Sequence, residues 1–535
     1  MNKPDTQNRY VAPLILLAFA LVGSFGCQPA TKTTDETVKP NPETQSPKTD
    51  KTDDSVTKVE ANSDGAIVID GDLAAVDWAS MVGKQISISG DLVIVDTYDL
   101  VRRGQIKVAR DRLFIPTSHV DPNDASSSGN SFKGGSNVAS VTEARKWNDR
   151  ATIVVDDGSN KENIFPPTLF PKLGDTEPTV RVGSVLNGIT GKLVNVRNTI
   201  TLVPSQPLQY NAADRPSRPA VGDSLVTVAS FNVLNYFTTI DNGRNQARGA
   251  DSKSELQRQE DKIVAAILAL DADVIGLMEL ENSLEAEQQL LQALNRQAGK
   301  DVFKGSGIPA GFQSAPGGDN AIRVGIIYRS DRVTPKGGVT MIRDDAFAVA
   351  RTPIVQTFES KKLTKAFTIV VNHFKSKGGS DRADPANKDQ GDGQGAYNAT
   401  RTSQSLSICK FIEQLNGQPD VLVIGDLNAY GQEDPIDAFR AKGLVDLHDQ
   451  NGNPSTTGKP SRHYSYIYYG QSGSLDHAMA TKSLAKKVTG IATWHINADE
   501  PRFLDYNQEY NPGPLYQADP FRSSDHDPVL IGIGN

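Results

Sequence analysis

Apolar runs of strand length recur from Leu225 to the end of the sequence, and polar side chains follow most of them directly. Continuous apolar runs of roughly four to eight residues are typical of strands that are buried on both faces. Segments with the helical spacing of apolar residues lie between some of these runs. This alternation predicts an α/β domain whose active site lies at the polar strand ends. The predicted strands are 225–231, 273–278, 323–328, 367–371 and 421–424, and the predicted helices are 255–270 and 401–415.

The polar residues after the strands are mostly carboxylates, amides and imidazoles. They are Asn232, Glu279, His373, Asp426, Asn428, Asp476, Asp525 and His526. Carboxylate and amide oxygens are the ligands that hard cations prefer in proteins. The cysteines and histidines of the sequence do not have the spacing of zinc ligands. The pattern therefore predicts a site for Mg²⁺ or Mn²⁺, with Ca²⁺ as an alternative or additional ion.

The order of these segments resembles the motifs of the endonuclease/exonuclease/phosphatase superfamily, which includes DNase I and abasic-site endonucleases. The closest resemblance is to the ExeM/NucH-type branch of bacterial extracellular nucleases, and it covers Leu225 to Ile533. It implies a DNase I-like fold, which is a two-sheet β-sandwich flanked by helices. The segments that carry it are 232–235, 279–282, 372–377, 425–429, 474–477 and 523–528.

The resemblance also implies a role for each polar residue. Asn232, Glu279 and Asp525 would hold the metal ion, while Asp426 and Asn428 would orient the water and the phosphate. Two of these assignments have a simpler alternative, because Asn232 could be a turn residue and Asp426 with Asn428 could cap the next helix.

Histidines would supply the remaining chemistry of phosphodiester hydrolysis. His526, hydrogen-bonded to Asp476, would assist in-line attack or stabilise the pentacoordinate oxyanion, and His373 would protonate or stabilise the departing oxygen. Arg351, Asn372 and Lys375 would contact the substrate; Arg323 competes with Arg351 for the phosphate contact, and Lys375 could equally be a solvated loop lysine.

The residues before this domain predict an export signal, a tether and a second domain. Residues 1–27 combine early basic residues with a short apolar run and Cys27, and they resemble a bacterial signal peptide with a lipobox. Residues 28–63 are polar and proline-rich, which predicts a disordered tether. Alternating apolar residues and glycines predict a small all-β domain over 64–207, and this region resembles the OB-like module of the same branch. The catalytic domain is assigned to 221–535.

These observations predict an exported, divalent-metal-dependent phosphodiesterase, with extracellular DNA in preference to RNA as the expected substrate of an endonuclease. The protein would be an outer-membrane lipoprotein or a secreted protein, so a lipid anchor would be its only contact with the membrane. The net charge of -8 does not indicate a basic surface for nucleic acid over the whole protein, but an enzyme needs only a local basic groove. The alternative is a phosphodiesterase or phosphatase for another substrate, such as a phospholipid or a nucleotide. No protein partner is implied, and the catalytic domain is expected to cleave without the β-domain, with a weaker hold on long substrates.

Overall fold

The computed structural model describes residues 58–61, 65–123, 136–175, 179–196, 198–417, 419–450, 463–509, 511 and 515–535. They belong to one compact unit, residues 57–535. The expected signal peptide, with Cys27, and most of the expected tether lie outside the described residues. Among the described residues, no helix has the length and apolar character that a membrane span requires.

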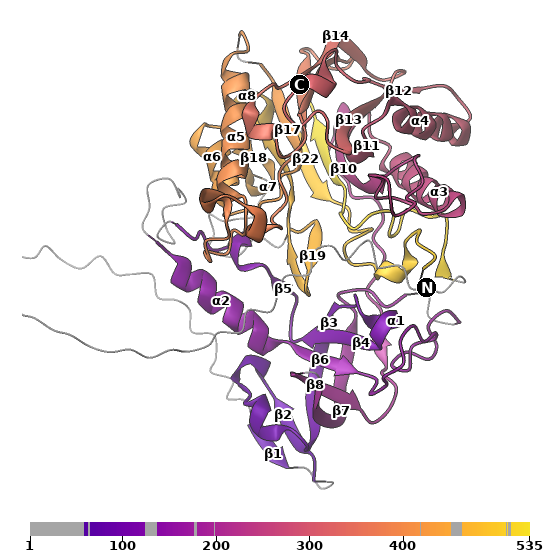
Figure 1. Ribbon diagram of the computed structural model, residues 1–535, viewed down its shortest axis with the longest axis vertical. Helices are drawn as coiled ribbons and strands as arrows, with labels where there is room; N and C mark the ends of the chain where they lie inside the picture. Colours follow the sequence, from indigo (N-terminus) through magenta and orange to yellow (C-terminus); the bar gives the residue numbers. More distant parts are fainter. Residues whose placement is uncertain are drawn as a thin grey trace, which may run out of the picture. The chain divides into compact units, whose positions relative to one another are not determined.

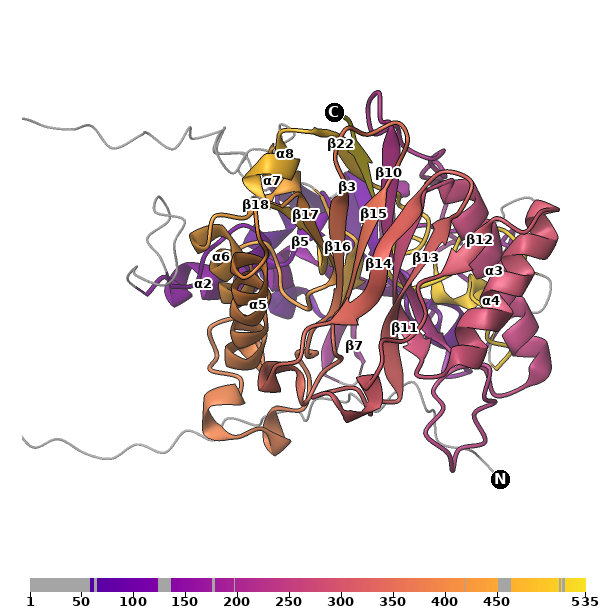
Figure 2. The ribbon, with the colours of Figure 1, turned by 90° about the horizontal axis from the view of Figure 1, so that it is seen from above.

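Two six-stranded sheets pack face to face in the described part of the C-terminal region, which confirms the predicted β-sandwich (Figures 1 and 2). The first sheet has the order β12-β13-β11-β10-β23-β22, and the second has the order β14-β15-β16-β17-β21-β18. Strands of the first sheet are β10 (Val226–Tyr236), β11 (Val274–Glu281), β12 (Phe303–Gly305), β13 (Ile322–Arg329), β22 (Val488–Thr493) and β23 (Val529–Ile533). Strands of the second are β14 (Thr334–Met341), β15 (Ile354–Glu359), β16 (Phe367–His373), β17 (Val421–Asp426), β18 (Val445–Asp446) and β21 (Asp476–Ala480).

Helices cover the outer faces of both sheets, so the central strands are buried on both sides. Figure 2 shows one helix pair on each side of the sandwich. The first sheet carries α3 (Lys253–Leu270) and α4 (Leu284–Ala298), and the second carries α5 (Asn398–Glu413) and α6 (Asp434–Ala441). Short helices α7 (Leu447–Gln450) and α8 (Lys482–Ala485) flank β21. Three apolar layers result, one between the sheets and one under each helix pair, which explains the continuous apolar runs of the sequence.

The N-terminal region forms a barrel, because β3 pairs with both β4 and β7 and closes the ring β3-β4-β6-β8-β7. A closed ring of this kind leaves no free strand edge, and it agrees with the expected OB-like architecture. The ring strands are β3 (Gln85–Asp96), β4 (Gln105–Ala109), β6 (Ile153–Asp156), β7 (Val185–Val196) and β8 (Thr199–Pro204), and β1 (Lys58–Ala61), β2 (Ile67–Asp70) and β9 (Tyr210–Asn211) extend the sheet.

The expectation that this region is all-β was wrong, because it contains α1 (Leu100–Arg103) and α2 (Val138–Ala151). Only Val141, Asn148 and Ala151 of α2 are buried, so the helix shows almost no apolar periodicity in the sequence. Part of the expected tether is also ordered, since β1 pairs with β2 in antiparallel fashion.

The barrel and the sandwich share both a sheet and a core. Strand β5 (Leu113–Phe114) comes from the barrel region and pairs in parallel with β20 (Gln471–Gly473), which pairs in turn with β19 (Tyr466–Tyr468). Phe503, Leu504 and Leu515 of the C-terminal region belong to the same apolar cluster as the barrel strands. The chain thus folds its two regions against each other over an apolar junction.

Candidate active site

Three adjacent strands of the second sheet bring His373, Asp426 and Asp476 into one row. In the strand register His373 lies opposite Asp426, and Asp426 lies opposite Asp476. Directly opposed residues point to the same face of a sheet, so all three side chains face the same way. All three are at most 3% exposed. Gly425 lets β17 come close to β16, since a Cβ there would lie 2.0 Å from the carbonyl oxygen of Asn372.

The first sheet contributes Asn232 and Glu279 through an irregularity in the pairing of β10 with β11. The register shifts between Asn232 and Tyr236, and Leu234, Asn235 and Glu279 all have positive φ. Residues other than glycine rarely adopt this backbone, and they cluster at functional sites where the surrounding structure holds them. Here the bulge turns Glu279 so that its Oε2 accepts a hydrogen bond from the backbone N–H of Asn235 at 2.9 Å.

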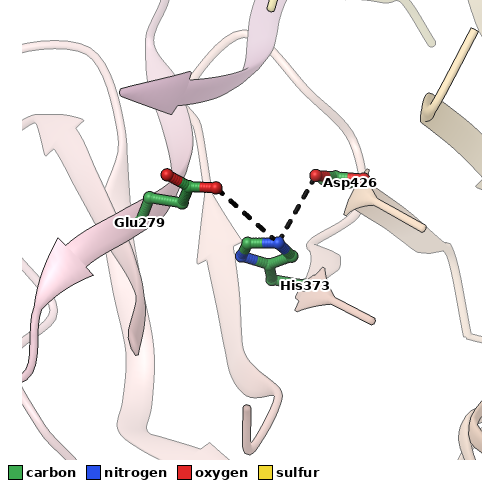
Figure 3. Close-up of side chains that lie close together, drawn as sticks. All are labelled: Glu279, His373 and Asp426. Carbon is green, nitrogen blue, oxygen red and sulfur yellow. Dashed lines mark ion pairs between the residues drawn. The ribbon is translucent and has the colours of Figure 1, made fainter. Parts of the chain in front are cut away.

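Glu279, His373 and Asp426 form a compact group with the donor atoms of a metal site (Figure 3). His373 Nε2 lies 3.9 Å from Glu279 Oε1 and 3.4 Å from Asp426 Oδ2. Asn232 Nδ2 donates to the same two oxygens at 3.2 and 3.4 Å. Among the described residues, this is the one group of three or more potential ligands that lie within 4.8 Å of one another.

The charges of this group fit a divalent cation. Burial raises the pKa of Glu279, and the negative charge of Asp525 raises it further. Burial also raises the pKa of Asp426 to about 7, and the nearby Asp476 and Glu279 carboxylates add to the rise. Buried carboxylates that repel one another are stabilised by a cation between them, and their oxygens are the ligands that Mg²⁺ or Mn²⁺ prefers. Glu279 and Asp426 would hold such an ion, while the Oδ1 of Asn232 accepts a hydrogen bond from the N–H of Leu234 and its Nδ2 faces the two carboxylates.

His526 and Asp476 form a buried, charge-assisted pair next to this group. His526 Nδ1 lies 2.7 Å from Asp476 Oδ2, and its Nε2 lies 3.9 Å from Asp426 Oδ2. Asp476 Oδ2 also accepts a hydrogen bond from Ser465 Oγ at 2.6 Å. Burial opposes the positive charge, but the Asp476 and Asp426 carboxylates outweigh it and raise the pKa of His526 well above its usual value. These carboxylates therefore favour the protonated imidazolium form of His526.

His373 has the opposite charge state. Burial lowers the pKa of His373 well below its usual value, and the positive charges of Arg351, His526, Arg248 and Lys375 lower it further. Burial and these charges favour the neutral imidazole, and the two carboxylate contacts drawn in Figure 3 orient its ring. The same four groups place positive charge around the acidic cluster, which favours binding of a phosphate.

Asn428 and Arg351 fix the backbone behind His373. Arg351 Nη1 donates to the carbonyl oxygen of Phe374 at 3.0 Å, and Asn428 Nδ2 donates to the same oxygen at 3.3 Å. The N–H of Asn428, which also has positive φ, donates to Asp426 Oδ1 at 2.9 Å. Asn428 thus links the Asp426 carboxylate to the backbone that follows His373.

The structure does not bring every candidate residue into the cluster. Asn372 follows the alternation of β16 to the face opposite His373, and its Nδ2 donates to the carbonyl oxygens of Val370 and Ile424 within the sheet. Lys375 Nζ donates to Ser376 and lies 4.1 Å from the ring centre of Tyr397. Burial lowers the pKa of Lys375 to about 8.

Three further residues adjoin this site, and sequence reasoning missed the role of two of them, Ser465 and Arg248. Ser465 bonds Asp476, the ring of Tyr466 lies 4.7 Å from that of His526, and the charge of Arg248 reaches His373. Ser465 lies among alternating tyrosines with no motif of its own.

Comparison with known proteins places this site in a family. No curated protein matches the sequence. Similar solved structures include the human nocturnin catalytic domain with bound sulfate (17% identity, 58% of this chain, 95% of that chain, TM-score 0.37), a mannosyl-6-phosphatase of Bacteroides thetaiotaomicron (17%, 58%, 100%, 0.36) and D. rerio TDP2 complexed with a single-strand DNA product (14%, 58%, 99%, 0.35). The family model that matches spans residues 229–526, which is more than half of the chain and includes nearly all of the residues described above. The chain belongs to the endonuclease/exonuclease/phosphatase family.

Proposed function

We propose that this protein is a divalent-metal-dependent phosphodiesterase that acts as an endonuclease on extracellular DNA. Members of its family are hydrolases of phosphate esters. The observation that carries the proposal is the acidic group of Glu279 and Asp426 beside the Asp476–His526 pair. Hydrolysis of a phosphodiester requires neutralised phosphate charge, an oriented water and a stabilised leaving group, and this arrangement supplies residues for each.

The acidic group would hold Mg²⁺ or Mn²⁺, with Asn232 and Asp525 close to it. A bound divalent cation would withdraw charge from a phosphate oxygen. Asp426, which lies between both histidines, is placed to accept a hydrogen bond from the attacking water. The support from Asn428 keeps this carboxylate in position.

The two histidines are suited to different catalytic roles because they differ in charge. A protonated His526 is suited to stabilise the oxyanion of the pentacoordinate transition state, because Asp476 holds its ring and keeps its charge. His373 is neutral and adjoins both Glu279 and Asp426, so it is suited to hydrogen-bond the departing oxygen. Of the two roles that the sequence left open for His526, its charge favours oxyanion stabilisation over assistance in attack.

A nucleic acid is the substrate that the surroundings of the site favour. Arg248, Arg351 and Lys375 place positive charge beside the acidic group, although the whole chain is acidic. The barrel adjoins the sandwich through β5 and β20, so a polymeric substrate can contact both regions. Barrels of the OB type commonly bind single-stranded nucleic acids.

We also propose that the protein is exported, either anchored through Cys27 or secreted. The support is the sequence of residues 1–27 alone. Replacing Cys27 with Ala should release the protein from membranes or block its maturation. An unchanged membrane fraction would remove the lipid anchor and leave the nuclease proposal intact.

Product analysis with plasmid DNA, RNA, sphingomyelin and nucleotides, each with and without EDTA, tests the proposed activity. We expect metal-dependent nicking of plasmid DNA and full loss of cleavage in EDTA. Cleavage of sphingomyelin or of a phosphomonoester in place of DNA would establish the alternative substrate class. Undiminished activity in excess EDTA would refute the metal-dependent mechanism.

A further inference from the structure

A hairpin of tyrosines leads from the proposed catalytic centre to solvent. Strand β19 begins with Tyr466, whose ring lies 4.7 Å from that of His526, and it ends with Tyr468. Residues two apart on a strand point to the same face, so Tyr468 continues the row that Tyr466 begins. Tyr469 follows, and its ring meets that of Tyr468 edge to face at 4.6 Å.

The two outer rings, those of Tyr468 and Tyr469, are exposed to solvent. Tyr468 is 50% exposed and Tyr469 is 65% exposed. The turn consists of Tyr469 and Gly470, since Tyr468 pairs with Gln471, and both turn residues have positive φ (50° and 84°). Two-residue turns of this kind favour asparagine followed by glycine. Tyr469 therefore occupies a backbone position that its residue type disfavours, with little burial to offset the strain.

The barrel holds this hairpin in place. Lys107 of β4 donates to the carbonyl oxygen of Tyr469 at 3.3 Å, and its Nζ lies 5.3 Å from the centre of the Tyr469 ring. On the other strand, Gln471 Oε1 accepts a hydrogen bond from Asn148 of α2 at 2.6 Å. Strand β20 lies between β19 and β5 and pairs with both, so β5 joins the barrel region to the hairpin (Figure 1). The barrel region thus anchors the backbone of the hairpin that carries the exposed rings.

We propose that Tyr468 and Tyr469 form a stacking subsite for unpaired bases of a nucleic acid strand whose phosphate lies at the Glu279–Asp426 group. This inference rests on the proposed nuclease function and adds a preference for single-stranded segments. Exposed aromatic rings beside a phosphate site stack on bases of any sequence, whereas the bases of a duplex already stack on one another. A lipid surface is the less suitable occupant, because insertion into it favours tryptophan, phenylalanine and leucine side chains, and the exposed side chains here carry hydroxyl groups.

The variant Tyr468→Ser/Tyr469→Asn tests this subsite without disturbing the fold. Both side chains are at least half exposed, and asparagine suits the backbone of the turn. Trp147→Ser is the matched control, because Trp147 is 45% exposed on α2 while its neighbour Asn148 is the residue that faces the hairpin. Thermal unfolding should show the same midpoint for both variants as for the wild type.

Two measurements with a 12-residue oligothymidylate then test the stacking subsite. We expect the double variant to raise the KM for its cleavage, and the Kd from fluorescence anisotropy in EDTA, by roughly 10-fold or more. The kcat for bis(p-nitrophenyl) phosphate should not change, and an oligonucleotide of abasic residues should bind both proteins equally. An equal loss of affinity for the abasic strand, or no change in Kd for oligothymidylate, would overturn the proposal.

The same experiment separates this inference from the proposed function. A wild-type protein that hydrolyses bis(p-nitrophenyl) phosphate but no nucleic acid would refute the nuclease, while the anisotropy would still measure base stacking. Vesicles of sphingomyelin and phosphatidylcholine form the last arm. Loss of vesicle binding in the double variant, with unchanged binding of oligothymidylate, would assign the hairpin to a membrane and overturn the stacking subsite.

Discussion

Replacing Asp476 with Asn should slow catalysis about 10²-fold and shift its pH dependence. Asp476 Oδ2 accepts hydrogen bonds from both His526 Nδ1 and Ser465 Oγ in a buried setting. A hydrogen bond to a charged group contributes about 1.5–3 kcal/mol, and about 1.4 kcal/mol corresponds to a factor of 10 in rate. Loss of the upper value in the transition state therefore lowers kcat by about 10²-fold.

The shift in pH follows from the same contact. The Asp476 carboxylate is the larger of the charges that outweigh burial and keep the pKa of His526 well above its usual value. A group with a raised pKa stays protonated at neutral pH and loses its proton as the pH rises through that pKa. Without the Asp476 charge the pKa of His526 falls, so the alkaline limb of the kcat profile moves to lower pH.

Steady-state cleavage of a fluorescent oligonucleotide at saturating Mg²⁺, from pH 6 to pH 10, measures both effects. His477→Ala is the control, because His477 Nε2 contacts the carbonyl oxygens of Ala429 and Ser474, away from His526. That variant should unfold at a lower temperature but keep its kcat in the folded fraction. A kcat for Asp476→Asn within twofold of the wild type, with an unmoved alkaline limb, would refute the role of the pair.

Three further predictions concern the histidine, the metal and the junction. His373→Ala should lower kcat by roughly 10²-fold with a nearly unchanged KM, and an unchanged kcat in steady-state assays would remove His373 from the chemistry. Chelation should abolish activity, and Mg²⁺ or Mn²⁺ should restore it. In a Mg²⁺ titration Glu279→Ala should regain part of its activity at high concentration, because a lost metal ligand weakens binding of the ion. If the activity of this variant did not depend on the Mg²⁺ concentration, the ion would bind elsewhere. Arg112→Ala should destabilise the whole unit by about 1.5–3 kcal/mol in urea unfolding, because the Asp499 carboxylate loses two hydrogen bonds from Arg112 and keeps those of Tyr464 and the charge of Arg181. A loss below about 1 kcal/mol would show that the junction does not depend on this pair.

The sandwich could be predicted from the sequence because its strands are buried on both faces. Continuous apolar runs give a strong signal, and the structure confirms a strand at each predicted position, for example β16 over Phe367–His373. The polar strand ends located the site, since His373, Asp426 and Asp476 meet in register. The superfamily assignment is confirmed, while the nuclease branch and the residue roles stay predictions.

Other features depend on contacts that local patterns do not encode. Helix α2 buries only one edge, so its polar sequence has no apolar periodicity that would indicate a helix within the region expected to be all-β. The bulge that turns Glu279 inward depends on three residues with positive φ, which no apolar periodicity marks. The position of Asn372, by contrast, can be predicted from the sequence. Adjacent strand residues point to opposite faces, so Asn372 and His373 cannot both face the site.

The junction also changes the expectation for the isolated catalytic domain. A chain that begins near Val221 lacks the barrel strands that cover Phe503, Leu504 and Leu515. It also lacks β5 and the Arg112 partner of Asp499. We now expect such a fragment to be less stable than the sequence suggested, and the domain boundary itself stays a prediction.

The shared core has a consequence for the order in which the chain can fold. The barrel strands are synthesised first, but the apolar residues that complete their core, Phe503, Leu504 and Leu515, are among the last to leave the ribosome. Contacts between such distant residues form slowly and only after nearly the whole chain is available. The nascent barrel therefore lacks three of its core side chains until the C-terminal region has been made.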